Sequence, residues 1–268
     1  MPSAAPITDQ ISSVCTRLDC GPLSSRTLRV VEALGSTSPQ ERVIDGVLNY
    51  VANRIARIDK RAGAARLRFC EVATDHDWRR VRELRKRCYP VSLPYLAEVL
   101  DADGSDPHDR HSFVYAAFVE DRALATIRAT TYPYETLEHL GEAELAAFLG
   151  DGWKTDYVEW GRLLVDPGYR RMRLTPALIT YAGFRLLMST PYRSYFGYTR
   201  QHVRTLISSF AIDSSTLPFQ IPSRGDHHYL MTKGSLSIGA IRELPRWLRH
   251  ATARRAGMDA GHAVARAG

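Results

Sequence analysis

The sequence predicts an α/β fold in which helices flank a mixed sheet. Segments with strand-like and helix-like patterns alternate between residues 67 and 236, which is the order expected of such a fold. Two strand-like segments are joined only by the polar residues 120–122, as in an antiparallel hairpin. A later strand is followed by a long helix before the next strand. The sheet should therefore be antiparallel at first and parallel around its fourth strand.

An N-terminal extension, residues 1–66, is expected to carry one amphipathic helix. Residues 1–37 are rich in Ser, Thr, Pro and Gly, and we expect them to be mobile or loosely docked. A Ser-Pro-Gln-Glu sequence beginning at Ser38 is a helix start, because Ser caps free amides, Pro suits the first turn and Glu reaches back to the cap. Val and Ile then recur at helical spacing from residue 43 to 58, which predicts a helix to about Arg61.

The central domain, residues 67–236, is expected to contain every strand of the sheet. Its elements should be strands at 67–73, 113–119, 123–131, 157–165, 194–199 and 228–232, and helices at 75–88, 135–149, 174–188 and 203–210. The C-terminal segment, residues 237–268, should form a basic amphipathic helix and tail, in which Leu244 and Trp247 oppose Arg242 and Arg246.

Composition limits the classes of protein. The chain has 268 residues, 44% of them hydrophobic and 24% charged, which fits one catalytic domain with appendages. We expect a cytoplasmic protein, because no apolar run reaches the ~20 residues of a membrane span and no secretory signal begins the chain. The four cysteines lie too far apart for a zinc pattern, so no metal is expected.

A net charge of +7 favours an acidic partner. Nucleic acid, an anionic membrane surface and an acidic carrier protein are the three candidates. Nucleic acid is not expected, because the chain lacks an interleaved aromatic and basic pattern. The basic C-terminal helix is a candidate for peripheral contact with a membrane surface.

A basic turn joins the strand at 157–165 to the helix at 174–188. Its residues 165–171 read VDPGYRR, and Arg173 follows. A turn that exposes backbone N–H groups beside a helix N-terminus can bind phosphates, although a plain basic turn is the structural alternative. The segment resembles the acyl-carrier pyrophosphate segment of the GCN5-related N-acetyltransferase (GNAT) family. The resemblance implies that the acyl carrier is bound by Val165, Arg170, Arg171 and Arg173.

Further segments resemble the acyl-homoserine-lactone autoinducer synthases and the related long-chain N-acyl amino acid synthases. The similarity covers roughly residues 67–200, and LLVDPGYR at 163–170 favours the N-acyl amino acid synthases. In the GNAT family glycines stand where this chain has Arg173 and Thr175. The residues that carry the resemblance are Arg85, Tyr89, Tyr95, the pair Asp106 and Asp109, Arg128, and the Glu-x-x-Arg pair Glu159 and Arg162.

Acyl transfer from a thioester to an amine needs a base, a donor for the thioester oxygen and a clamp for the acceptor. The resemblance implies that Glu159 is the base, directly or through water, and that Arg162 acts beside it on the same strand. An ion pair of Glu159 with Arg162 or Arg128 is the structural alternative. The two roles can coexist.

The remaining residues of the resemblance are expected to bind the acceptor. The three arginines Arg85, Arg128 and Arg162 can either pair with Asp106 and Asp109 in a buried network or clamp an acceptor carboxylate. We favour the network for most of them, with Arg128 as the best clamp candidate. Two tyrosines, Tyr89 and Tyr95, are expected to line the acceptor pocket.

These observations predict a GNAT-like acyl-CoA N-acyltransferase fold and an N-acyltransferase activity. The expected reaction moves a fatty acyl chain from acyl carrier protein, or from acyl-CoA, to the amine of an amino acid, without a bound cofactor. The missing glycines and the basic surface favour the carrier protein. One alternative is a homoserine-lactone synthase that uses S-adenosylmethionine. Another is a non-catalytic acyl-ligand-binding module, which the retention of Glu159 disfavours.

Overall fold

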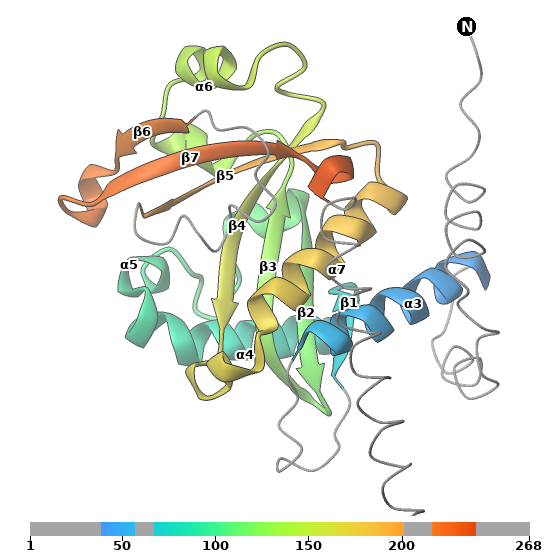
Figure 1. The fold of residues 1–268 in the computed structure, drawn as a ribbon. Helices are drawn as coiled ribbons and strands as arrows, with labels where there is room; N and C mark the ends of the chain where they lie inside the picture. The colour runs from blue at the N-terminus through green and yellow to red at the C-terminus, as the bar shows by residue number, and fades with distance from the viewer. Residues whose placement is uncertain (1–38, 57–66, 201–215, 240–268) are drawn as a thin grey trace, which may run out of the picture. The chain divides into compact units, whose positions relative to one another are not determined.

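The computed structural model describes residues 39–56, 67–200 and 216–239 (Figure 1). The expected helix at 203–210, the segment 1–37 and nearly all of the expected C-terminal helix lie outside the described residues. The chain divides into two compact units, residues 1–48 and 49–268, and helix α3 (Pro39–Ile55) crosses that boundary. The predicted domain limits stay predictions.

A mixed sheet forms the centre of the second unit. Its seven strands lie in the order β1-β2-β3-β4-β5-β7-β6, and only the β4–β5 pair is parallel. This arrangement confirms the predicted change from antiparallel to parallel pairing at the fourth strand. The strands are β1 (Arg68–Glu71), β2 (Ser112–Val119), β3 (Arg122–Thr130), β4 (Tyr157–Val165), β5 (Ser194–Arg200), β6 (Thr216–Gln220) and β7 (His228–Ser235).

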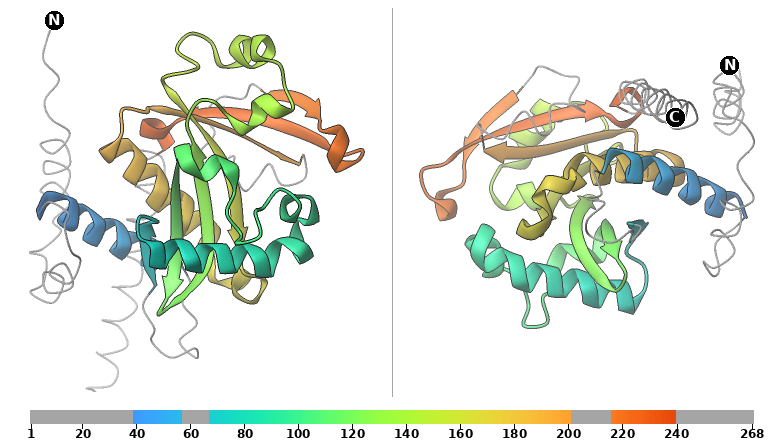
Figure 2. Two further views of the ribbon diagram at one scale, coloured as in Figure 1. Left: turned by 180° about the vertical axis from the view of Figure 1, so that it is seen from behind. Right: turned by 60° about the horizontal axis from the view of Figure 1, so that its bottom comes forward.

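Helices α4 (Asp75–Ser92) and α7 (Leu174–Ser189) cover opposite faces of the sheet (Figure 2). Helix α4 begins at Asp75 because the Thr74 side chain accepts a hydrogen bond from the Asp77 amide. Its apolar side chains pack in one core cluster with Val114 and Phe118 of β2 and Ala123 of β3. The shorter helices are α5 (Pro94–Ala97), α6 (Glu142–Leu149) and the 3-10 turns η2 (Pro107–His111), η3 (Glu135–Glu138), η4 (Pro167–Met172) and η6 (Pro222–Arg224).

Three elements differ from the expectation. The helix expected at 135–149 is divided into η3 and α6, because the chain is extended at Gly141, which precedes α6. Helix α5 and strand β6 are additions. Strand β6 contains Pro218, which cannot donate a ladder hydrogen bond and is therefore tolerated at the sheet edge that β6 occupies.

Strands β4 and β5 separate part of the way along their length (Figure 1). They pair from Tyr157 to Trp160 on β4 and from Ser194 to Gly197 on β5. Beyond that point β4 continues its pairing with β3, and β5 continues with β7. The sheet therefore opens between β4 and β5 just after Trp160 and Gly197.

We expect Gly197→Ala to lower the free energy of unfolding by about 1–3 kcal/mol, because overpacked sites cost that much. A Cβ at Gly197 would lie 2.9 Å from the Trp160 carbonyl oxygen, which is backbone and cannot move aside easily. Urea unfolding of the two proteins measures the difference. Gly168→Ala is the matched control, since a Cβ there meets only the Asp166 carboxylate at 3.4 Å. Equal loss in both variants would contradict the close contact.

Candidate active site

Asp106 is the centre of a buried cluster of charged side chains. Its carboxylate pairs with Arg128 Nη1 at 2.5 Å and with Arg162 Nε at 2.7 Å. The side chains of Asp106 and Arg128 are fully buried. Burial would raise the pKa of Asp106, but the charges of Arg162 and Arg128 outweigh it and hold the pKa well below its usual range. Asp106 is therefore ionised at neutral pH.

Two further carboxylates complete the cluster. The Arg85 guanidinium donates to both oxygens of Asp109, at 2.5 and 3.0 Å. Glu135, from η3, bridges Arg128 and Arg162 at 2.5 and 2.7 Å. The resemblance thus selected residues that lie together, and Glu135 joins them without having been predicted.

A β-bulge in β4 brings Glu159 and Arg162 to the same side of the sheet. From Thr126 to Arg128 strand β3 advances two residues, while β4 advances three, from Leu164 to Gly161. Arg162 has a φ of 51°, in the left-handed region. In a regular strand two residues three apart would face opposite sides. The bulge therefore lets one strand supply both a carboxylate and a guanidinium to the cluster around η3.

Glu159 is 2% exposed, and its two oxygens are held by one residue. The Thr136 hydroxyl donates to Oε1 at 2.6 Å, and the Thr136 amide donates to Oε2 at 3.2 Å. Burial and the negative charge of Glu135 raise the pKa of Glu159 to about 7. A carboxylate with a pKa near neutral can both take and release a proton at physiological pH, as a general base must.

Arg224, at the end of η6, reaches the same cluster from the far side of the opening. Its Nη1 donates to the Tyr198 hydroxyl at 3.0 Å, and its Nη2 lies 3.6 Å from Glu135. Its guanidinium carbon lies 4.6, 5.7 and 5.9 Å from the ring centres of Tyr95, Tyr198 and Tyr229. Sequence reasoning missed Arg224, because it belongs to no motif and follows a strand that was not predicted.

The two tyrosines expected at the acceptor pocket have different surroundings. Tyr89 is fully buried, and among the described residues its hydroxyl has no hydrogen-bond partner. Burial raises its pKa against the charges of Arg85, Arg162 and Arg128, so it stays a neutral phenol beside the cluster. Tyr95 is half-buried and stacks on Arg224. Their roles toward an acceptor stay predictions.

The basic turn after β4 contains the 3-10 turn η4 and is held by Asp166. Asp166 accepts a hydrogen bond from the Gly168 amide and pairs with Arg87 and Arg122 at 2.9 and 2.8 Å. Because these arginines neutralise Asp166, the turn keeps its positive character. Because Asp166 caps the turn and Pro167 suits its first position, the sequence Asp-Pro-Gly forms η4 instead of continuing β4.

The three arginines of the turn are exposed, and Val165 is the last residue of β4. Arg173 has a φ of 54°, the left-handed conformation that glycine adopts most easily. It stands at the position where the sequence resemblance to the GNAT family expects glycine. Helix α7 starts directly after Arg173, without a side-chain cap. Binding of an acyl carrier by Val165, Arg170, Arg171 and Arg173 stays a prediction.

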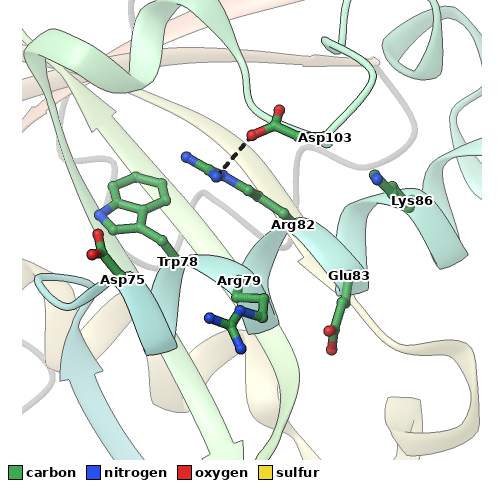
Figure 3. A pocket seen from close by; sticks show the side chains of 7 residues that line it. All are labelled: Asp75, Trp78, Arg79, Arg82, Glu83, Lys86 and Asp103. Carbon is green, nitrogen blue, oxygen red and sulfur yellow. Dashed lines mark ion pairs between the residues drawn. The ribbon is translucent and has the colours of Figure 1, made fainter.

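A separate groove of about 360 Å³ runs along α4 (Figure 3). Its lining mixes three positive and three negative side chains, and Arg82 pairs with Asp103 across it at 2.8 Å. None of the residues expected at the active site lines it. The lining residues are Asp75, Trp78, Arg79, Arg82, Glu83, Lys86 and Asp103.

The described parts of the chain were not found to hold a metal cluster or a membrane-spanning helix. These parts contain no group of three or more His, Cys, Asp or Glu residues that could hold a metal ion. None of their helices is long and apolar enough to cross a membrane.

At the level of sequence the chain matches no protein-family model and no curated protein. Solved structures are similar in fold. A CoA-dependent acyl-homoserine lactone synthase, BjaI, with S-adenosylmethionine (SAM) and isopentyl-CoA aligns with a TM-score of 0.53 and 14% identity, over 67% of this chain and 87% of that chain. The same synthase with MTA gives a TM-score of 0.52 at 14% identity, with the same coverage. FeeM, an N-acyl amino acid synthase from uncultured soil microbes, aligns with a TM-score of 0.46 and 12% identity, over 65% of this chain and 93% of that chain.

The second unit therefore has the GNAT-like α/β fold, a mixed sheet flanked by helices, that the sequence resemblance implied. The predicted likeness to autoinducer synthases is confirmed at the level of the fold. At 14% identity the similarity identifies a fold, and the activity has to be argued from the side chains of this chain.

Proposed function

We propose that the protein is an N-acyltransferase that moves a fatty acyl chain from a thioester to the amine of an amino acid. Glu159 carries the proposal: it is a buried carboxylate whose pKa is raised to about 7, on the strand that borders the opening between β4 and β5. A structural ion pair would hold a carboxylate ionised, as Asp106 is held. Glu159 instead accepts hydrogen bonds from a neutral residue, Thr136.

The reaction follows from that position. Glu159 takes one proton from the acceptor ammonium, and the free amine attacks the thioester carbonyl. The C–N bond forms, the C–S bond breaks, and the second proton lost by the attacking nitrogen passes to the leaving sulfur, so the carrier leaves as a thiol. The charged cluster behind Glu159 fixes η3, and with it the Thr136 donors that orient the carboxylate.

The acyl donor is expected to be acyl carrier protein, with acyl-CoA as the alternative. The turn after β4 supports a phosphate-bearing donor, because a helix N-terminus and the exposed Arg170, Arg171 and Arg173 converge there. An acidic carrier protein would meet this basic rim over a wide area. A cytoplasmic location and a membrane-surface contact of residues 237–268 are further proposals.

The function is tested by incubating the purified protein with acyl carrier protein or CoA thioesters of several chain lengths. Each of the twenty amino acids, or SAM, serves as acceptor, and mass spectrometry identifies the product. We expect an N-acyl amino acid. An acyl lactone formed from SAM would replace the proposal with a homoserine-lactone synthase. Thioester binding without any product would make the protein an acyl-ligand-binding module.

We expect replacement of Arg170, Arg171 and Arg173 by Ala to slow use of acyl carrier protein more than use of acyl-CoA. Charge steers the association of an acidic protein with a basic rim, and salt weakens that steering. The measurement is kcat/KM for one acyl chain on each donor, at low salt and at about 0.5 M salt, where the Debye length is about 4 Å. If CoA is the better donor at both salts and the triple variant loses both donors equally, the carrier-protein assignment is wrong.

A further inference from the structure

We propose that Arg224 binds the carboxylate of the acceptor, with the hydroxyls of Tyr95 and Tyr229 as further donors. The acceptor is then an amine that bears a carboxylate, and Arg224 sets this specificity. The inference rests on the proposed function and assigns to Arg224 a role for which the sequence favoured Arg128.

The other arginines of the cluster are already engaged. Arg85 holds both oxygens of Asp109, and Arg128 and Arg162 each pair with Asp106 and Glu135. Arg128 is fully buried, so a substrate could reach it only if those pairs opened. Breaking a buried ion pair is strongly unfavourable. The free energy needed to open the ion pairs of Arg128 would therefore offset the free energy gained by binding an acceptor carboxylate there.

Arg224 is held in a different way. It packs on tyrosine rings and donates to a neutral hydroxyl, and its nearest carboxylate, Glu135, lies at 3.6 Å, beyond a normal hydrogen bond. Its Nη2 lies 3.4 Å from His139 Nε2. Burial and the charge of Arg224 lower the pKa of His139, so this histidine stays neutral and adds no competing charge. A planar guanidinium with spare donors fits a carboxylate in two-point geometry.

A second, independent group points to the same place. Tyr229 is 3% exposed, and among the described residues its hydroxyl has no hydrogen-bond partner. Burial raises the pKa of Tyr95, and the phenol of Tyr229 adds to that rise, while Arg224 opposes it. The two phenols and the guanidinium therefore lie within electrostatic reach of one another. Buried hydroxyls are normally paired, and a ligand oxygen would pair this one.

The position also suits an acceptor whose amine must meet Glu159. Tyr198 lies on β5 two residues beyond Phe196, the partner of Glu159 in the β4–β5 pair, and so faces the same side. Burial and the charges of Glu135 and Glu159 raise the pKa of Tyr198, and Arg224 lowers it. Tyr198 accepts a hydrogen bond from Arg224 at 3.0 Å and stands two residues along β5 from the partner of the base, where the strands separate.

Charge balance supports the assignment. The cluster contains four arginines, Arg224 included, against Asp106, Asp109, Glu135 and Glu159. Once Glu159 has taken the proton of the acceptor ammonium, three carboxylates face four guanidiniums, and one positive charge is left over. A carboxylate brought by the acceptor supplies the missing negative charge beside Arg224, whose ion pair with Glu135 is 3.6 Å long, whereas each of the other three arginines has an ion pair of 2.7 Å or less.

The test compares the best of the twenty L-amino acid acceptors with its carboxamide, which keeps the amine and loses the charge. Arg224→Gln should raise KM for the amino acid about 10- to 100-fold, with kcat changed less than about threefold, as expected for loss of a charge-assisted hydrogen bond. KM for the carboxamide should stay within about twofold. Arg224→Lys should recover only part of the loss, since Lys cannot form the two-donor fork.

Two variants separate binding from stability. Tyr229→Phe removes a hydroxyl without a described partner, so it should raise KM severalfold without lowering the melting temperature. Arg193→Gln removes an exposed arginine that donates to the backbone carbonyls of Thr190 and Tyr192. It should change neither KM nor kcat for the amino acid.

An Arg224→Gln enzyme that keeps the wild-type preference for amino acid over carboxamide overturns the inference and leaves the proposed function standing. Equal losses for both acceptors also overturn it, because they indicate a structural role for Arg224. A wild-type protein that acylates no amino acid overturns the proposed function and this inference together.

Discussion

Glu159→Gln is expected to lower kcat by about 10²-fold or more while the fold is kept, because general-base catalysis contributes on that order. Glutamine has nearly the same shape and can still accept a hydrogen bond from Thr136, which now binds both carboxylate oxygens. It cannot take a proton from the acceptor ammonium. Steady-state kinetics with the acceptor found in the product assay measure the loss.

The pH profile gives a second readout for the same residue. The pKa of Glu159 is raised to about 7, so kcat/KM of the wild type should increase with pH and level off above about 7. Because this pKa is raised on folding, the Glu159 carboxyl group binds its proton more tightly in the folded state than in the unfolded state. The contribution of Glu159 to stability should therefore fall as pH rises from about 5 to 8, and the Gln variant should lack this slope.

Glu138→Gln is the matched control, since Glu138 is an exposed glutamate of the same 3-10 turn as Glu135 and pairs only with His108 in the described structure. It should leave kcat and the pH profile unchanged. Near-wild-type turnover of a folded Glu159→Gln enzyme would remove Glu159 from the mechanism. The GNAT-like fold would be unaffected by that result.

Much of the fold could be predicted because local patterns and tertiary structure agree. Strand β4 has the limits expected from its pattern, 157–165, and β2 and β3 differ from the expectation by one residue at their ends. Helix α4 begins at the expected residue and continues beyond Cys88 to Ser92. Pro90 lies in the last turn, where it removes one backbone hydrogen bond, and the helix ends two residues later.

The parts that could not be predicted depend on contacts between distant residues. The bulge at Arg162 is set by the register of β4 against β3, which a strand pattern of period two does not contain. Arg224 reaches the cluster only because β6 and β7 carry η6 back over the opening. The sequence pattern predicts that Glu135 begins an ordinary helix, whereas in the structure its side chain bridges two buried arginines.

The pairing of the aspartates with the arginines could be predicted in kind but not in detail. The sequence favoured a buried network, and the structure contains one. The sequence does not show how deeply each arginine and each carboxylate is buried. The Arg128 side chain is completely buried and has close ion pairs, whereas the Arg224 side chain is 9% exposed and has one ion pair, at 3.6 Å. Burial and pairing together therefore decide which arginine can meet a substrate.

The largest effect on stability is expected for Asp106→Asn. Asparagine keeps the shape of the side chain but removes the charge that neutralises Arg128 and Arg162. Loss of one partner from a buried ion pair costs about 3–5 kcal/mol, because the remaining charge stays buried without compensation. Asparagine can still accept from the His108 amide, so the start of η2 should be kept. Urea unfolding at pH 7 measures the difference in the free energy of unfolding.

The same substitution has a predicted pH dependence. The folded-state pKa of Asp106 lies below its usual value near 4, so its stabilisation is complete above about pH 4 and is lost as pH falls toward the folded-state pKa. The stabilities of the wild type and the Asn variant should therefore converge in acid. Asp103→Asn, at an exposed aspartate that pairs with Arg82, should cost less than about 1 kcal/mol at pH 7. If Asp106→Asn costs no more than that control, the network around Asp106 does not stabilise the fold, and its arginines become available for the substrate role that the sequence first suggested.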